Sequence, residues 1–327
     1  MNAPVEPLPP SSEPSVPAGP QPRRDRAGRK SAIFDTVFLG SEGVRAGWRA
    51  GLYVSLTLVL LTAMQLLGET MGLPLRVNPR ALTPWPLLIQ EIMLFGCALG
   101  AAAALGLAEG RPVGGYGLPW RRAFRGHFWQ GALWGFAEIT VLVLLIAALG
   151  GYSLGEMALS GGQALVSAGL WAAVFLMVGL AEEFAFRGYL LATLTLGMGF
   201  WPASVVLSLI FGAVHLGNPG ETSSGVLTVA VVGMFFCLTV RRTGDLWFAS
   251  GAHAAHDFGL AFVYSAPNSG TLIRGSLFNA SAEGPAWLTG GAAGPEGSAL
   301  AFVVLALMTV LFARVYRSAP ARRNAQD

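Results

Sequence analysis

Long apolar runs separated by short polar segments dominate the chain. A helix of roughly 20 apolar residues crosses a bilayer core about 30 Å thick. The pattern therefore predicts eight membrane-spanning helices, near 50–72, 85–108, 128–150, 164–190, 201–216, 224–240, 246–265 and 298–316. The expected fold class is an all-α polytopic membrane protein, with a transmembrane helical domain over residues 45–318.

Polar segments at both ends of the chain lie outside this domain. Residues 1–40 are rich in Pro and Ser and end in a basic cluster, which is typical of a disordered Pro-rich tail. They contain no apolar stretch of the kind that a cleavable signal peptide needs. Residues 319–327 form a second polar tail, and the Gly-rich loop near 266–297 has no predicted structure.

Composition and charge agree with a membrane location. The chain is 53% hydrophobic and 12% charged, whereas an ordinary soluble domain is about 25% charged. The net charge of +3 comes from cations that flank the apolar runs, so membrane topology explains it better than nucleic-acid binding does. Cys97 and Cys237 fall in apolar runs and are predicted to be buried free thiols.

The cations also predict an orientation. The positive-inside rule places Arg and Lys in the cytoplasmic segments, and with eight spans both termini are then cytoplasmic. The residues behind this prediction are Arg23, Arg24, Arg26, Arg29, Lys30, Arg121, Arg122, Arg125, Arg241, Arg242, Arg314, Arg317, Arg322 and Arg323. The exceptions, on the opposite side, are Arg76, Arg80 and Arg274. Lys30 is the single lysine among 21 Lys and Arg, which suggests a GC-rich bacterial genome and an inner-membrane location.

Ionisable side chains inside the spans are functional candidates, because an unpaired charge in a membrane costs several kcal/mol. Glu91 and Glu138 stand alone near span ends, where snorkelling or an interhelical hydrogen bond is the expected explanation. The other candidates gather in three segments, "EEFAFR" at 182–187, "FGAVH" at 211–215 and "HAAHD" at 253–257.

Spacing within these segments predicts which side chains meet. Residues four apart share a helix face, so Glu183 should pair with Arg187 and His253 should lie beside Asp257. Glu182 is turned by about 100° from Glu183 and is free to face a cavity. His256 lies at a different angle from His253, so we expect it to be an interfacial or packing residue.

These polar groups are predicted to meet within the membrane. Counted from the predicted cytoplasmic ends of their helices, Glu182, His215 and His253 lie roughly 12 to 20 Å below the same surface. A buried carboxylate beside two imidazoles can activate water, and two His with one acid can also hold a catalytic zinc ion. The protease signature H-E-x-x-H is absent, so a metal site would need ligands from separate helices.

In order and spacing, the three segments resemble the E-E-x-x-x-R, F-x-x-x-H and H-x-x-x-N/D motifs of the CAAX protease and bacteriocin-processing family of intramembrane proteases, which includes the type II CAAX prenyl endopeptidases. The resemblance covers about residues 165–262. It implies an intramembrane endopeptidase whose site residues are Glu182, Glu183, Arg187, His215, His253 and Asp257.

The resemblance also implies a role for each residue. Glu182 would activate water, Glu183 and Arg187 would support it, and His215 and His253 would serve as metal ligands or oxyanion donors. Asp257 stands where the prenyl-protease branch has Asn. An ionised Asp cannot donate a hydrogen bond, so two roles are favoured over an oxyanion role for Asp257: a ligand in a zinc site with His215 and His253, or a group that orients a histidine. The family is described both as zinc-dependent and as metal-free.

Two other readings compete with this one. Ser250 beside His253 is similar to a rhomboid-type serine site, although those residues should come from two different helices. A non-proteolytic membrane scaffold or a transporter would instead use the buried charges for packing or proton relay. For the protease, the expected partners are the lipid bilayer and a membrane-anchored or lipidated peptide, presented from the cytoplasmic side.

Overall fold

The computed structural model describes residues 38–40 and 43–317. Its α-helices are α2 (Ala46–Thr70), α3 (Pro84–Ala108), α4 (Gly126–Ala148), α5 (Gly161–Glu183), α6 (Tyr189–Met198), α7 (Phe200–Val214), α8 (Ser223–Thr243), α9 (Trp247–Asp257), α10 (Ala286–Thr289) and α11 (Ala299–Val315). Two π-helical turns, Phe184–Gly188 and Phe258–Val263, directly follow α5 and α9. The strands are β1 (Leu39–Gly40), β2 (Gly43–Val44), β3 (Tyr152–Ser153) and β4 (Ser281–Ala282).

The chain divides into two compact units after Arg45. In the first, β1 pairs with β2 in an antiparallel hairpin, with Leu39 opposite Val44. The predicted tails, 1–40 and 319–327, lie outside the described residues except for 38–40. The cations from Arg23 to Lys30 and those at 322 and 323 lie outside them as well.

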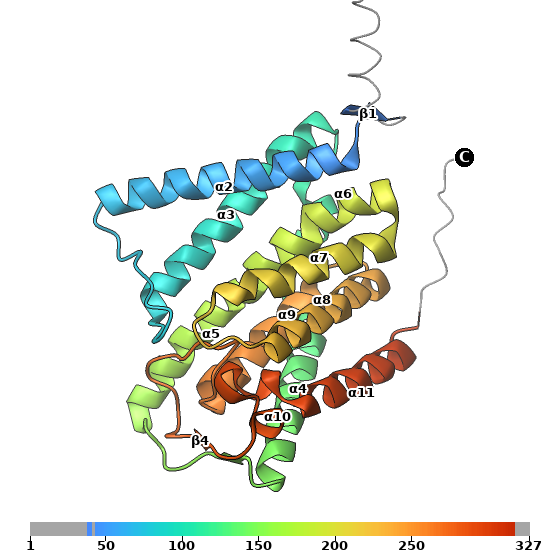
Figure 1. Cartoon of the computed structure of the whole chain (residues 1–327). Coiled ribbons are helices and arrows are strands. Elements are labelled where there is room, and N and C mark those ends of the chain that lie inside the picture. Colours follow the sequence, from blue (N-terminus) through green and yellow to red (C-terminus); the bar gives the residue numbers. More distant parts are fainter. Residues whose placement is uncertain (1–37, 41–42, 318–327) are drawn as a thin grey trace, which may run out of the picture. The chain divides into compact units, whose positions relative to one another are not determined.

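The second unit is a helical bundle, which confirms the predicted all-α polytopic membrane protein (Figure 1). Within the described residues, six helical segments are long and apolar enough to cross a membrane. They are Ala46–Thr70, Pro84–Ala108, Gly126–Ala148, Gly161–Met198, Phe200–Gly217 and Ser223–Thr243. The remaining two predicted spans are helical but shorter, with 11 residues in α9 and 17 in α11.

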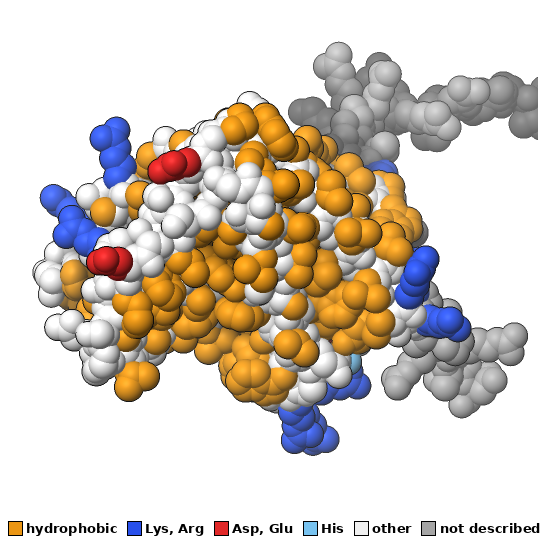
Figure 2. Space-filling model, turned by 90° about the horizontal axis from the view of Figure 1, so that it is seen from below, with side chains coloured by type: hydrophobic (Ala, Val, Ile, Leu, Met, Phe, Trp, Pro, Cys, Tyr) orange, Lys and Arg blue, Asp and Glu red, His pale blue; other side chains and the backbone are white. Residues whose placement is uncertain are grey.

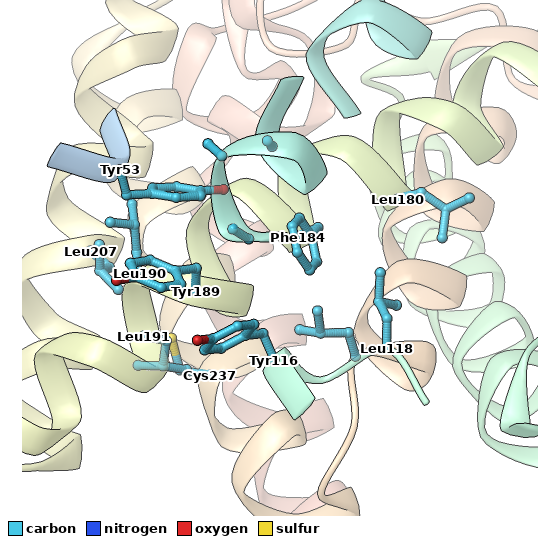
Figure 3. Packing of buried hydrophobic residues seen from close by; sticks show 14 of the residues in the cluster. Tyr53, Tyr116, Leu118, Leu180, Phe184, Tyr189, Leu190, Leu191, Leu207 and Cys237 are labelled. Carbon is cyan, nitrogen blue, oxygen red and sulfur yellow. The ribbon is translucent and has the colours of Figure 1, made fainter. Parts of the chain in front are cut away.

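One end of the bundle is held together by arginines and tyrosines. Glu109, just after α3, forms an ion pair with Arg49 of α2 and accepts hydrogen bonds from Tyr116 and Tyr189. The Tyr189 ring stacks on that of Tyr53, with 4.8 Å between centroids (Figure 3). We call this the arginine-rich end: the start of α2, residues 109–125, residues 241–246 and residues 314–317.

Contacts join these segments to one another. Asp245 is fully buried and lies 3.4 Å from Arg122 and 2.9 Å from His127. The backbone N–H of Leu246 donates to the carbonyl of Gly117, and Tyr316 donates to Gln130 near the start of α4.

The opposite end, which we call the loop end, consists of residues 71–83, 149–160, 215–222 and 264–298. In Figure 1, β4 and α10 lie together at the lower left, and α11 runs away from them to the right. Antiparallel pairing of β3 with β4 joins two of these loops. The backbone N–H of Leu82 donates to Leu272, and the side chain of Asn218 donates to the carbonyl of Ser269. The loop near 266–297, to which the sequence assigned no structure, therefore contains β4, α10 and several hydrogen-bonded turns.

Helix α9 is held tightly between α4 and α5 by small residues. A Cβ atom built on Gly135 of α4 would lie 2.0 Å from the carbonyl oxygen of Ala252, and one on Gly131 would lie 2.0 Å from that of Phe248. On the other side, a Cβ on Gly179 of α5 would lie 2.7 Å from the carbonyl oxygen of Ser250. Only glycine allows the helix backbones to approach this closely, so these contacts fix the position of α9.

Side-chain exposure is that of a protein embedded in lipid. Hydrophobic side chains cover the middle of the face seen in Figure 2, and Arg side chains lie along its margins. Large apolar residues on α2, such as Leu58 and Val59, are more than half exposed. Both predicted thiols, Cys97 and Cys237, are buried and free, as expected.

Candidate active site

The carboxylate and arginine of the first motif meet where α5 gives way to a π-helical turn. Glu183 ends α5, and Arg187 lies in the turn that follows. Their side chains are fully buried, and Arg187 Nη1 lies 3.2 Å from Glu183 Oε1. The guanidinium also lies over the Phe211 ring, 4.1 Å from its centroid. The predicted pairing is thus present in the structure, and π-helical turns are frequent at functional sites.

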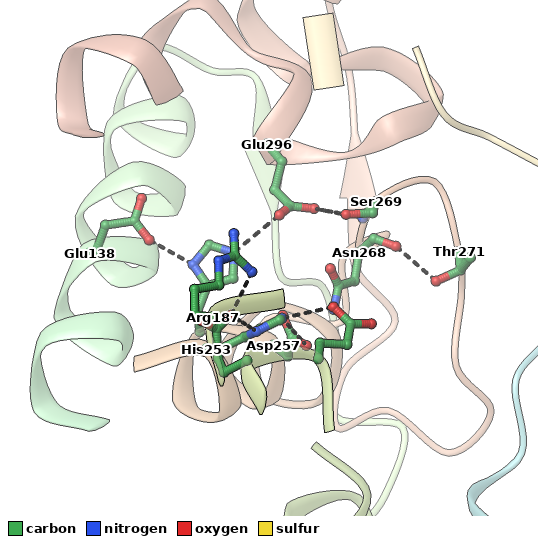
Figure 4. Close-up of polar contacts among 11 residues, drawn as sticks. Glu138, Arg187, His253, Asp257, Asn268, Ser269, Thr271 and Glu296 are labelled. Carbon is green, nitrogen blue, oxygen red and sulfur yellow. Dashed lines mark hydrogen bonds and ion pairs between the residues drawn. The ribbon is translucent and has the colours of Figure 1, made fainter. Parts of the chain in front are cut away.

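His253 is the centre of the polar cluster (Figure 4). Its Nδ1 lies 3.1 Å from Glu183 Oε1. Its Nε2 lies 3.5 Å from Asp257 Oδ2 and 3.8 Å from Glu182 Oε2. One imidazole therefore touches carboxylates from both its own helix and α5, and the spacing of four residues places Asp257 beside it as predicted.

His215 follows directly after α7, at the loop end of the bundle. His215 was predicted to lie at the depth of Glu182, and both side chains line the same cavity. Its Nδ1 lies 2.7 Å from the carbonyl oxygen of Phe211, and the two rings meet edge to face. A carbonyl oxygen only accepts hydrogen bonds, so Nδ1 carries the proton and Nε2 is left for a ligand or substrate.

A cavity of about 360 Å³ connects these groups. Glu182, His215, His253 and Asp257 line it, whereas Glu183 and Arg187 are not among its lining residues. Glu182 Oε2 is buried and has no hydrogen-bond partner. The structure thus brings four of the predicted residues to one cavity and leaves the ion pair behind them.

Three polar residues of this cavity were assigned no functional role from the sequence, and a fourth was overlooked. His256, expected to be a packing residue, is instead bound on both sides: Nδ1 lies 2.6 Å from Glu138 Oε2, and Nε2 lies 3.3 Å from Glu296 Oε1. Glu138 therefore makes the interhelical contact expected of it. Glu91 lines the same cavity with a buried, unpartnered Oε2. The spacing of three between His253 and His256 could have revealed that both share a helix face.

Glu296 gave no signal in the sequence, because it lies in a Gly-rich loop far from the motifs. It is buried, and its Oε2 accepts a hydrogen bond of 2.6 Å from the backbone N–H of Ser269. Burial alone would raise the pKa of the Glu296 carboxyl, but the hydrogen bonds from His256 and Ser269 outweigh it and lower this pKa. Glu296 therefore anchors the loop end to α9 in its charged form.

The donor groups do not gather into a metal centre. Within residues 38–40 and 43–317, no group of three or more His, Cys, Asp or Glu side chains is arranged to hold a metal ion. Of the two histidines of the predicted zinc site, His253 has both nitrogens facing carboxylates, whereas His215 presents Nε2 without a close partner. The zinc site of His215, His253 and Asp257 stays a prediction.

The rhomboid-like alternative lacks the necessary geometry. Ser250 is fully buried, and its hydroxyl has no hydrogen-bond partner among the described residues. It is not among the residues that line the cavity.

Comparison with known proteins places the three motifs in one family. The family model described as type II CAAX prenyl endopeptidase Rce1-like matches residues 164–259. This segment is thus similar to the Rce1-like family. The match begins within α5 and ends just after Asp257, so it contains all six predicted site residues. No curated protein and no solved structure matches the chain.

The Rce1-like family consists of membrane-embedded CAAX endopeptidases, so a protease of this general class is the activity that the match supports. The match spans less than a third of the chain. It does not cover the helices before α5 or after α9.

Proposed function

We propose that the chain is an intramembrane endopeptidase in which Glu182 activates a water molecule for attack on a peptide bond. The observation that carries the proposal is the buried Oε2 of Glu182, which has no hydrogen-bond partner and faces a cavity shared with His215 and His253. A buried carboxylate without a hydrogen bond is costly, and a bound water would satisfy it.

The reaction balances with the chain's own groups. Glu182 takes a proton from water as the oxygen attacks the carbonyl carbon, and the resulting oxyanion accepts a hydrogen bond from His253 Nε2 when both nitrogens of that ring carry a proton. Glu182 then gives its proton to the amine nitrogen, the C–N bond breaks, and a carboxylic acid and an amine leave; the acid then loses its proton to water.

The other residues position these groups. Glu183 accepts from His253 Nδ1 at 3.1 Å, which fixes the ring and keeps Nε2 directed toward Glu182 and Asp257. Arg187 compensates the charge of Glu183. Because the His, Cys, Asp and Glu side chains of the described residues are not arranged to hold a metal ion, the proposed reaction uses none. Zinc bound by His215, His253 and Asp257 is a separate hypothesis, which metal analysis of the purified protein tests.

The experiment compares peptide termini in membranes of cells that express the wild-type chain, Glu182→Gln or Glu69→Gln at matched levels. Glu69→Gln is the control, because this exposed glutamate near the end of α2 lies outside the cavity. We expect a set of termini that Glu69→Gln retains and Glu182→Gln loses, because a general base contributes about 10²- to 10⁴-fold to a rate.

The alternative is a scaffold or transporter-like protein that uses the buried charges for packing. In that case no terminus would depend on Glu182, and cells with Glu182→Gln would keep the wild-type phenotype. Either of these results would favour the alternative over proteolysis.

A further inference from the structure

The two ends of the bundle differ in charge. At the arginine-rich end lie Arg49, Arg111, Arg121, Arg122, Arg125, Arg241, Arg242, Arg314 and Arg317, with Glu109 and Asp245 as the acidic residues of its described part. At the loop end lie Arg76, Arg80 and Arg274, together with Glu69, Glu156, Glu221, Glu283 and Glu296. The positive-inside rule assigns the arginine-rich end to the cytoplasm, so the loop end faces the opposite compartment.

The cavity extends toward the loop end. Its lining includes one or more residues from three of the loops there: Val77, Pro79, Asn218, Asn268, Ser269, Thr271 and Glu296. The segments 109–125, 241–246 and 314–317 contribute no lining residue. His215, one of the predicted site residues, itself lies at the loop end.

Close packing of α4 against α9 closes the route between these two helices from the cavity to the arginine-rich end. On the side of α9 toward that end, the backbone contacts of Gly131 with Phe248 and of Gly251 with Phe128 join α4 and α9. A Cβ on Gly251 would lie 2.2 Å from the carbonyl oxygen of Phe128. The described residues there leave no room for a polypeptide between these two helices.

The lining also restricts the chemistry of the substrate. Its charged and titratable groups are five carboxylates and three histidines (Glu91, Glu138, Glu182, Asp257 and Glu296, with His215, His253 and His256), and none of the described lining residues is Lys or Arg. A free C-terminal carboxylate would meet carboxylates without a permanent cation to receive it. Apolar side chains such as Phe175, Val178 and Leu305 instead favour an apolar segment, and the amides of Asn218 and Asn268 suit its backbone.

From these observations, and resting on the proposed function, we infer that the substrates are exported polypeptides. They enter from the loop end, on the side of the membrane opposite the cytoplasm, and are cleaved at an internal bond of an apolar segment. This differs from the cytoplasmic presentation expected from the sequence.

The first test measures which face each end occupies. In a Cys97→Ala/Cys237→Ala background, Ser223→Cys reports the loop end and Gly115→Cys reports the arginine-rich end; both sites are exposed. Gly115 also has room for a side chain, because the nearest atom to a Cβ there would be 4.0 Å away. Intact cells are treated with a membrane-impermeant maleimide. We expect labelling of Ser223→Cys at once and of Gly115→Cys only after permeabilisation. The reverse pattern would overturn the inference.

The second test links this face to the site. Thr271→Cys lies on the cavity lining, so a bulky impermeant maleimide added outside should lower the Glu182-dependent termini to the level of Glu182→Gln. The same treatment of Gly115→Cys should leave them unchanged. Glu182-dependent termini that map to cytoplasmic C-termini, or that persist in the blocked Thr271→Cys protein, would refute this entry route. If no terminus depends on Glu182, the proposed proteolysis fails, while labelling still decides the orientation.

Discussion

The ion pair between Glu183 and Arg187 allows a direct measurement of how this membrane protein tolerates buried charge. Glu183 is 0% exposed and Arg187 is 2% exposed. In Glu183→Gln the guanidinium stays buried without an anion, and removal of one partner of a buried pair costs about 3 to 5 kcal/mol. The contact of Arg187 with the Phe211 ring is present in both proteins and cancels in the comparison. The new amide oxygen can still accept from His253.

The double variant Glu183→Gln/Arg187→Met removes both charges and isolates their coupling. We expect it to be more stable than Glu183→Gln alone, with a coupling energy of about 2 kcal/mol or more. The assay is reversible unfolding of the purified protein in mixed detergent micelles, followed by circular dichroism. The reasoning is refuted if Glu183→Gln unfolds within about 0.5 kcal/mol of the wild type, or if the two substitutions are additive.

Two further predictions concern packing and charge elsewhere in the bundle. Gly135→Ala should lower the free energy of unfolding by about 1 to 3 kcal/mol and lower activity, because its Cβ would meet the carbonyl of Ala252 beside His253. The control Gly169→Ala, whose Cβ would have nothing within 4 Å, should leave the melting temperature unchanged or slightly raised. Equal melting temperatures for the two variants would contradict the close contact. For Glu109, burial alone would raise the pKa of the carboxyl, but hydrogen bonds from Arg49 and Tyr189 outweigh it and lower this pKa below 4.5. The stabilisation from the charged Glu109 is therefore complete above the unfolded-state pKa and is lost as the pH falls through the folded-state pKa. Glu109→Gln should lower the free energy of unfolding near pH 7 and make it depend less on pH in the acid range. Unfolding of both proteins at pH 7 and pH 4 measures this difference.

Local periodicity predicted a large part of the molecule. Apolar run length located the helices, since a chain in lipid must satisfy its backbone hydrogen bonds within each segment. The spacing of four residues was sufficient for the Glu183–Arg187 and His253–Asp257 contacts, because it fixes neighbours on a helix whatever the rest of the fold does.

Contacts between distant segments could not be predicted in this way. The approach of Glu296 to His256 depends on how a Gly-rich loop folds back over the bundle, and no local pattern encodes it. Sequence distance along α7 likewise does not say toward which end of the bundle the cavity extends. The π-helical turn after Glu183 could not be predicted either, because the sequence pattern assumes 3.6 residues per turn.

The glycine contacts that hold α9 between α4 and α5 have a consequence for protein engineering. A library aimed at new peptide specificity gains little from varying α9 or the facing positions 131, 135 and 179, because any larger residue there separates the backbones of α4 and α5 from that of α9, which carries His253. The variable part of the cavity lies on other elements, in Val232 of α8 and in Leu305 and Met308 of α11. Leu305 and Met308 line the cavity from a helix that the family match does not cover, and Val232 lines it from α8, which carries none of the three motifs. These are the positions at which specificity can change while His253 stays in place.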